Sequence, residues 1–186
     1  MIVVYYDIET TGLKLLEDTI TVMSVIVEDT STGTIIEEKT HNFITTEEAG
    51  LENDLRRRVY TLFEECDRIV GFNSLNFDLP FLAHWLSPYF GPLVEARWAL
   101  KMVDFYKTAH DLIHVKVGIA KMCTDNGIAV QKSGTGLLAI QWARERNFAA
   151  LEQYCMQVCC SPTPTHNLYI RTYSKTPCLV PIFVVF

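Results

Sequence analysis

Hydrophobic and polar positions in the first part of the chain follow the pattern of extended strands. Residues 2–8 form a nearly continuous apolar run that ends at a polar turn, and β-rich segments follow at 19–28 and 34–43. Turn residues at 30–33 separate the second segment from the third. Short apolar runs bounded by turn residues are typical of strands, so the chain is predicted to begin with an antiparallel three-stranded meander.

After this meander the pattern becomes helical. Apolar residues recur at helical spacing from Leu51 to Cys66, and Thr45 with Glu48 fits a capping box at the start of that helix. The remaining elements are predicted as a strand over 68–71, a helix over 78–86, a strand over 101–105, and helices over 116–125 (closed by 126–127), 136–146 and 148–157. This order predicts an α/β fold with a mixed β-sheet flanked by helices.

Composition supports one globular domain but divides the chain unevenly. The 186 residues are 49% hydrophobic, and their net charge of −6 argues against a protein that holds nucleic acid by bulk positive charge. The last acidic residue is Glu152, and four of the seven prolines and four of the six cysteines follow it. We therefore expect a domain over 1–157 and an atypical, poorly ordered tail over 158–186.

The ends and the cysteines favour an intracellular protein, cytoplasmic or nuclear, that is not secreted. Met1 is followed at once by a strand-like run, with no basic segment or cleavage site of a secretory signal. Six cysteines without a secretory route are most simply free thiols in a reducing compartment. The longest apolar run, 178–186, is too short for a membrane helix, so no membrane partner is expected.

Two acidic residues stand at the end of the first predicted strand. Asp7 and Glu9 are two positions apart, so their side chains project from the same face of the strand. Adjacent carboxylates repel each other, and a divalent cation removes that conflict. Oxygen ligands favour Mg²⁺ or Mn²⁺. The alternative interpretation is a solvated strand end without a ligand.

A second polar segment follows the strand predicted at 68–71. Asp78 opens the next helix, and Asn73 lies in the turn before it. An aspartate in this place can be a plain helix cap, and an asparagine can be an ordinary turn residue. Both interpretations are compatible with a metal site, because a helix N-terminus favours an anion.

Taken together, the two segments resemble the first two motifs of the DEDD 3′–5′ exonucleases, which are ribonuclease H-like enzymes. The resemblance covers about residues 1–158 and implies a ribonuclease H-like fold. It implies that Asp7, Glu9 and Asp78 hold two divalent cations, Mg²⁺ or Mn²⁺, for hydrolysis of a terminal phosphodiester of DNA or RNA. It also implies that Thr11 and Leu13 lie against the terminal nucleotide of a single-stranded or 3′-ended nucleic acid, and that Asn73 supports the site.

The third motif departs from the pattern. In the tyrosine branch of the family, a tyrosine that orients the attacking water is followed four residues later by an aspartate, the fourth metal ligand. Tyr154 fits, but Val158 occupies the aspartate position and no carboxylate follows it. Asp104 does not match the motif and is interpreted as a residue that caps or orients its local segment. We therefore expect impaired activity, and a splice or reading-frame difference beyond Gln157 would explain both Val158 and the tail.

Other hypotheses remain open at this stage. The chain could be an inactive nucleic-acid-binding module or a truncated product of an exonuclease gene, and any polymerase or helicase partner is unknown. His110 and His114 have the spacing of a zinc-binding helix, if the helix persists. A net-positive stretch could guide a nucleic-acid backbone toward the metals; its basic residues are Lys101, Lys107, Lys116, Lys121, Lys132, Arg144 and Arg146.

Overall fold

The computed structural model of the protein describes residues 1–114, 116, 118–125, 134–160, 169–171 and 179–181. Its centre is a five-stranded sheet with the spatial order β3 (Thr34–Asn42), β2 (Ile20–Asp29), β1 (Ile2–Thr10), β4 (Arg68–Gly71) and β5 (Met102–Asp104). β2 pairs antiparallel with β1 and β3, whereas β4 pairs parallel with β1 and β5. The mixed sheet confirms the predicted fold class.

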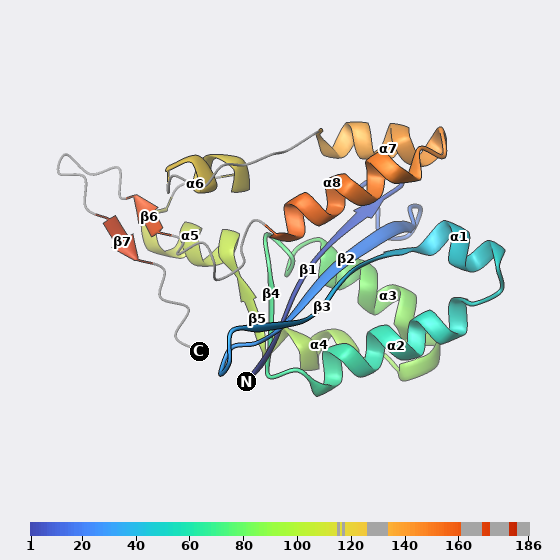
Figure 1. Ribbon diagram of the computed structural model, residues 1–186, viewed down its shortest axis with the longest axis horizontal. Coiled ribbons are helices and arrows are strands. Elements are labelled where there is room, and N and C mark those ends of the chain that lie inside the picture. Colours follow the sequence, from blue (N-terminus) through green and yellow to red (C-terminus); the bar gives the residue numbers. More distant parts are fainter. Residues whose placement is uncertain (115, 117, 126–133, 161–168, 172–178, 182–186) are drawn as a thin grey trace.

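Helices cover both faces of this sheet (Figure 1). The first apolar core includes side chains of α1 (Phe43–Glu48), α2 (Glu52–Glu65), α3 (Asp78–Phe90) and α4 (Val94–Ala99). The second includes side chains of α5 (Phe105–Ile113), α6 (Ile119–Asp125), α7 (Gly136–Arg144) and α8 (Phe148–Cys160). Helix α8 lies over the antiparallel part of the sheet, where it contacts β1, β2 and β3.

Strand β1 lies between the two cores and contributes to both. Val4, Tyr6 and Ile8 pack on the side of α1 to α4. Val3 and Tyr5 alternate with them and pack on the side of α5 to α8. This double burial explains why residues 2–8 form a nearly continuous apolar run instead of alternating with polar residues.

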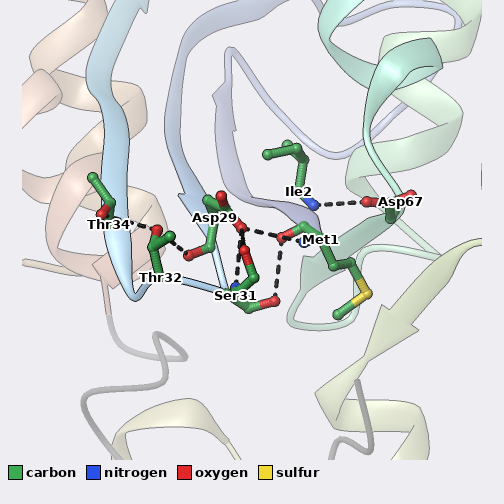
Figure 2. Close-up of polar contacts among 8 residues, drawn as sticks. Met1, Ile2, Asp29, Ser31, Thr32, Thr34 and Asp67 are labelled. Carbon is green, nitrogen blue, oxygen red and sulfur yellow. Dashed lines mark hydrogen bonds and ion pairs between the residues drawn. The ribbon is translucent and has the colours of Figure 1, made fainter.

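The start of β1 is held by polar contacts on both sides (Figure 2). The amino group of Met1 lies 3.2 Å from Asp29 Oδ1, and Ile2 N donates to Asp67 Oδ2 at 2.7 Å. The side chain and backbone of Ser31 also donate to Asp29 and, with the amino terminus, lower its pKa to about 2. These contacts connect the first strand to the end of β2 and the start of β4.

Several element boundaries differ from those predicted. Thr45 does not cap the helix that follows the meander, because α1 begins at Phe43 and the Asn42 side chain accepts from Thr45 N. A second helix, α2, follows Gly50, which has a φ of +69° that ends the helical path. Sequence patterns also missed α4 and α5, the second of which begins directly after Asp104.

The C-terminal part is described only in short pieces. Helix α8 continues past Gln157 to Cys160. Beyond it, β6 (Tyr169–Arg171) pairs antiparallel with β7 (Leu179–Pro181). Residues 161–168, 172–178 and 182–186 lie outside the described residues, so the poorly ordered tail stays a prediction. None of the helices in the described part of the chain is both long and apolar enough to cross a bilayer.

Candidate functional site

Asp7 and Glu9 lie near the C-terminal end of β1, where the strand has lost one neighbour. The parallel pairing with β4 ends at Tyr5 opposite Val70, so the later residues of β1 face no strand on that side. Both carboxylate side chains are half-buried. They alternate with buried Ile8 and belong to the face that α8 covers.

Asp78 is the first residue of α3, and its carboxylate reaches the gap beside β1. Ile8 N, between the two acids of β1, donates to Asp78 Oδ1 at 3.1 Å. The Asp78 side chain is 3% exposed. Burial raises the pKa of Asp78 to about 7, and the charge of Asp104 acts in the same direction, against the hydrogen bond from Ile8. The structure thus brings the two sequence-distant acidic segments together.

Tyr154 approaches the same acids from α8. Its side chain is buried and forms an edge-to-face contact with Trp142, with ring centroids 5.9 Å apart. Burial raises the pKa of Tyr154, and the negative charges of Glu9 and Asp7 raise it further. A neutral phenol beside two carboxylates can donate a hydrogen bond or orient a water molecule.

Thiols on α8 hold this helix against β1. The Cys155 thiol donates to the backbone oxygen of Asp7 at 3.3 Å and lies 3.7 Å from its Oδ2. One helical turn later, the Cys159 thiol donates to Tyr5 O at 3.5 Å. Burial and the charges of Asp7 and Glu9 raise the pKa of the Cys155 thiol well above its ordinary value. The Cys155 thiol is therefore neutral in its contacts with Asp7.

Val158 lies one turn beyond Tyr154 and is 8% exposed within the apolar core under α8. Tyr5 and Cys155 belong to the same core cluster. The position predicted for a fourth ligand is thus an apolar, nearly closed environment in this chain.

The turn after β1 is held by Asp18, a residue to which the sequence interpretation gave no role. Thr11 Oγ1 donates to Asp18 Oδ1 at 3.1 Å, and Lys14 N donates to Asp18 Oδ2 at 2.8 Å. A Cβ on Gly12 would lie 2.5 Å from either carboxylate oxygen, so the close approach requires glycine. The Thr11 hydroxyl is therefore used within the turn, whereas Leu13 is 78% exposed.

Asn73 lies in the turn between β4 and α3, in the left-handed region with a φ of +61°. Its side chain is half-buried and accepts from Asn76 Nδ2 at 3.1 Å. Leu79 N, at the start of α3, donates back to Ser74 O at 2.8 Å. These bonds join the turn to the helix that carries Asp78.

The donor chemistry suits hard divalent cations, because Asp7, Glu9 and Asp78 offer only carboxylate oxygens. The buried carboxyl of Asp78, whose ionised form burial disfavours, is also a group that a cation would stabilise. Within the described ranges, however, no three His, Cys, Asp or Glu side chains lie close enough together to enclose an ion. The three acids are thus neighbours without a closed cage.

Several predicted basic residues of the guiding stretch have protein partners instead. Lys101 Nζ donates to Glu64 O, in the last turn of α2, and to Cys66 O, just beyond the helix. Lys107 pairs with Asp111 on the same helix, and Arg146 forms a double hydrogen bond with Glu48 at 2.7 and 2.8 Å. Lys132 lies outside the described residues.

The two histidines considered as possible zinc ligands do not lie on one helix. Helix α5 ends at Ile113, and His114 follows in the left-handed conformation with a φ of +54°. His114 is exposed, whereas His110 is half-buried on the helix.

A family model described as the RNase_H superfamily matches residues 4–154. The chain belongs to this superfamily. The match includes both acidic segments and ends at Tyr154. No curated protein sequence matches the chain.

Solved structures of exonuclease I share the fold. One exonuclease I structure matches with a TM-score of 0.54 and 15% identity, over 80% of this chain and 42% of that one. E. coli exonuclease I with a dT13 oligonucleotide matches with a TM-score of 0.52 and 13% identity, over 82% and 41%. The zinc-bound complex of E. coli exonuclease I with single-stranded DNA matches with a TM-score of 0.54 and 13% identity, over 82% of this chain and 42% of that one. The chain spans less than half the length of these proteins.

Proposed function

We propose that this chain is a metal-dependent 3′–5′ exonuclease domain of the DEDD tyrosine branch, impaired by Val158 in the fourth-ligand position. Its substrate would be a single-stranded or 3′-ended DNA or RNA. The fold of exonuclease I and that protein's complex with an oligonucleotide support the substrate class.

The contact between β1 and α3 is the observation that carries the proposal. Ile8 N donates to Asp78 Oδ1, which brings the Asp78 carboxylate to the segment that contains Asp7 and Glu9. Seventy residues of chain separate the donor from the acceptor. A solvated strand end and a simple helix cap would not require these acidic segments to meet.

Each residue then has a role in hydrolysis. Asp7, Glu9 and Asp78 would hold two Mg²⁺ or Mn²⁺ ions, which supply an activated water and stabilise the leaving oxygen when bound. Tyr154 would orient the water by its hydroxyl, since it is close enough to Asp7 and Glu9 for their charges to affect its pKa. Exposed Leu13 would contact the terminal nucleotide, and Asn73 would support the turn before Asp78.

The Thr11 hydroxyl would stabilise the turn beside the substrate and would not bind the substrate itself. The hydroxyl donates to Asp18 and accepts from Thr19 N, so it is already committed within the protein. Because Thr11 N also donates to Thr19 O at 2.9 Å, the methyl group of Thr11 would be its contact with a terminal nucleotide, beside exposed Leu13.

A strand-degradation assay with Mg²⁺ or Mn²⁺ tests the proposal. We expect slow shortening of a 5′-labelled single strand from its 3′ end by the chain as given, and faster shortening by Val158→Asp. The added carboxylate restores an anionic ligand, which can recover several kcal/mol of transition-state stabilisation. A 3′-labelled strand releases its label at once if the direction is 3′–5′.

The matched control is Val158→Asp combined with Asp7→Asn, which must remove activity if the assay reports this site. Failure of both the given chain and Val158→Asp to shorten a 3′ end would refute the exonuclease. Label release from a 5′ end would refute the direction.

The apolar environment of Val158 favours a second candidate, a non-catalytic nucleic-acid-binding module. This candidate predicts that the chain binds a single-stranded oligonucleotide equally well with Mg²⁺ or with EDTA. It also predicts that Val158→Asp leaves the strand intact. Fluorescence anisotropy with a labelled oligonucleotide measures the binding.

A further inference from the structure

We propose that Asp104 is a positioning residue of the candidate site: its buried carboxylate fixes the turn over 72–77 and thereby places Asn73 and Asp78 beside the acids of β1. The inference rests on the proposed function for the reaction that it serves. Its structural part, the ordering of the turn, stands separately and is tested separately.

The parallel strands β4 and β5 bring Asp104 to this turn. Gly71, the last residue of β4, pairs with Asp104, the last residue of β5. Parallel neighbours end at the same edge of a sheet, so the chain leaves both strands side by side. After β4 it forms the turn and enters α3 at Asp78, and after β5 it enters α5 at Phe105.

Both oxygens of the Asp104 carboxylate are used. Oδ1 accepts from Asn73 N at 2.9 Å and from Lys107 N at 3.1 Å, and Oδ2 accepts from Leu75 N at 2.9 Å. A helix cap needs the bond to Lys107 alone. The bonds from Asn73 N and Leu75 N join Asp104 to residues 31 and 29 positions earlier in the chain. Two of the three hydrogen bonds to this carboxylate therefore come from the turn after β4.

The turn has a conformation that needs such support. Asn73 adopts a left-handed backbone, which is unfavourable for a residue with a side chain. The backbone N–H of Asn73 donates to the Asp104 carboxylate, which holds this conformation. Leu79 N then continues the turn into α3 by donating to Ser74 O. Displacement of the turn would therefore move the start of α3 and the Asp78 carboxylate.

Asp104 is suited to this role and not to that of the missing fourth ligand. Its side chain is 3% exposed, and backbone N–H groups satisfy both oxygens. A cation would have to displace these bonds. Asp104 thus acts on the site through Asn73 and Asp78.

Asp104→Ser separates the two functions of the residue. Serine is a good helix cap, so α5 keeps its bond to Lys107, but its single short hydroxyl cannot also reach Asn73 N and Leu75 N. The matched control is Thr135→Ala, which removes the side chain that caps α7, a helix outside the turn over 72–77. Both variants are made in the full chain and in the Val158→Asp background.

Hydrogen exchange read by mass spectrometry tests the ordering of the turn. We expect exchange in a peptide over 72–79 to rise about tenfold or more in Asp104→Ser and to stay unchanged in Thr135→Ala. Unchanged exchange in folded Asp104→Ser would overturn the inference, whatever the activity. Should Asp104→Ser fail to fold, Asp104→Asn, which keeps one acceptor oxygen, is judged by the same criterion.

Mn²⁺ binding to the protein without substrate, followed by electron paramagnetic resonance, tests the effect on the acids. We expect Asp104→Ser to weaken Mn²⁺ binding and to lower kcat by about tenfold or more, with KM little changed and with partial recovery at high Mn²⁺. Wild-type Mn²⁺ affinity and kcat in Asp104→Ser would overturn the positioning role. If neither the chain as given nor Val158→Asp binds Mn²⁺ or degrades a strand, the proposed function is refuted. The hydrogen-exchange result then decides alone whether Asp104 orders the turn.

Discussion

At the scale of single residues, the candidate site depends on polar groups that the core keeps in neutral form. Tyr154 and Cys155 are adjacent on α8, both are buried, and the charges of Asp7 and Glu9 raise the pKa values of both. Such groups can donate hydrogen bonds toward the acids without adding negative charge. Their chemical part in the site can therefore be separated from their packing by conservative substitutions.

Tyr154→Phe removes the hydroxyl and keeps the ring that packs against Trp142. We expect the rate of strand degradation in the Val158→Asp background to fall by a factor on the order of 10². The free energy of unfolding should change by no more than about 1 kcal/mol, because the apolar contacts remain. Degradation kinetics and urea unfolding measure the two effects. Equal rates with and without the hydroxyl would exclude a role of Tyr154 in orienting water.

His41 gives the fold a dependence on pH that is independent of the acids. It is 8% exposed on β3, and burial, with Lys39 and Arg58, lowers its pKa to about 4 from an ordinary value of 6.5. The unfolded chain therefore binds the proton more readily between these values, and stability falls as pH decreases from about 6.5 to 4. The loss from this residue is about 3 kcal/mol.

Urea unfolding across this pH range of the given chain and of His41→Gln measures that contribution. The carboxylates titrate in both proteins, so only the difference between the two curves reports His41. Parallel curves would show that the histidine titrates alike in the folded and unfolded chain.

At the scale of elements, the segments that follow β1, β4 and β5 determine where the acids lie. Asp18 closes the turn after β1. In the turn after β4, Gly71 approaches Ser74 so closely that a Cβ would lie 2.1 Å from the serine hydroxyl and 3.4 Å from the ring of Tyr6. The turn can therefore accept no side chain at Gly71 without moving.

Gly71→Ala should lower the free energy of unfolding by about 1–3 kcal/mol, because the added methyl group overpacks the turn. Removing the Ser74 hydroxyl in Gly71→Ala/Ser74→Ala should recover part of the loss. Gly136→Ala is the control, since a Cβ there meets nothing within 4 Å at the start of α7. Chemical denaturation compares the variants, and equal stability of the two alanine variants would contradict the close approach.

Sequence patterns predicted the strands and long helices of this fold well, because their apolar spacing is local. The antiparallel meander, the strand at 68–71 and the helix beginning at Asp78 all appear in the structure. Short elements were missed where tertiary contacts define them. Helix α5, for example, begins directly after a three-residue strand that ends at Asp104. The Asp104 carboxylate also binds a backbone N–H of the turn after β4, and the sequence around Asp104 does not indicate this contact.

The structure places the two acidic segments predicted for the site next to each other, and the sequence signals that pointed to them are also local. Asp7 and Glu9 lie near the end of a strand and Asp78 opens a helix, and the apolar patterns of both elements are strong. The roles of Asp18 and Cys155 could not be predicted in this way. The Cys155 thiol contacts Asp7 across 148 residues, and nothing in its own segment distinguishes it from the other cysteines of the chain.

At the scale of the whole molecule, the site and the core under α8 are physically continuous. Val158 is packed in the same cluster as Tyr154 and Cys155, so any substitution there affects stability as well as chemistry. Metal binding is expected to be linked to folding through this region, because a cation that binds only the folded chain stabilises it.

Val158→Asp should lower the free energy of unfolding by about 2–4 kcal/mol in EDTA, since it buries a charge without a partner. Mn²⁺ at about a hundred times its dissociation constant should restore about 2.7 kcal/mol. Val158→Asn is the control, because it buries a polar group of similar size that cannot supply an anionic ligand. Thermal unfolding with and without Mn²⁺ measures both, and equal responses of the two variants would contradict a fourth ligand at this position.

The hydrogen bonds from α8 to β1 also set the order in which the site can be completed during synthesis. They join Cys155 to Asp7 and Cys159 to Tyr5, across 148 and 154 residues. The acids of β1 are made first, whereas the helix that carries Tyr154 leaves the ribosome only when nearly all of the matched region has been translated. A nascent chain therefore contains Asp7 and Glu9 before their tyrosine, and the contacts between α8 and β1 can form only late in synthesis.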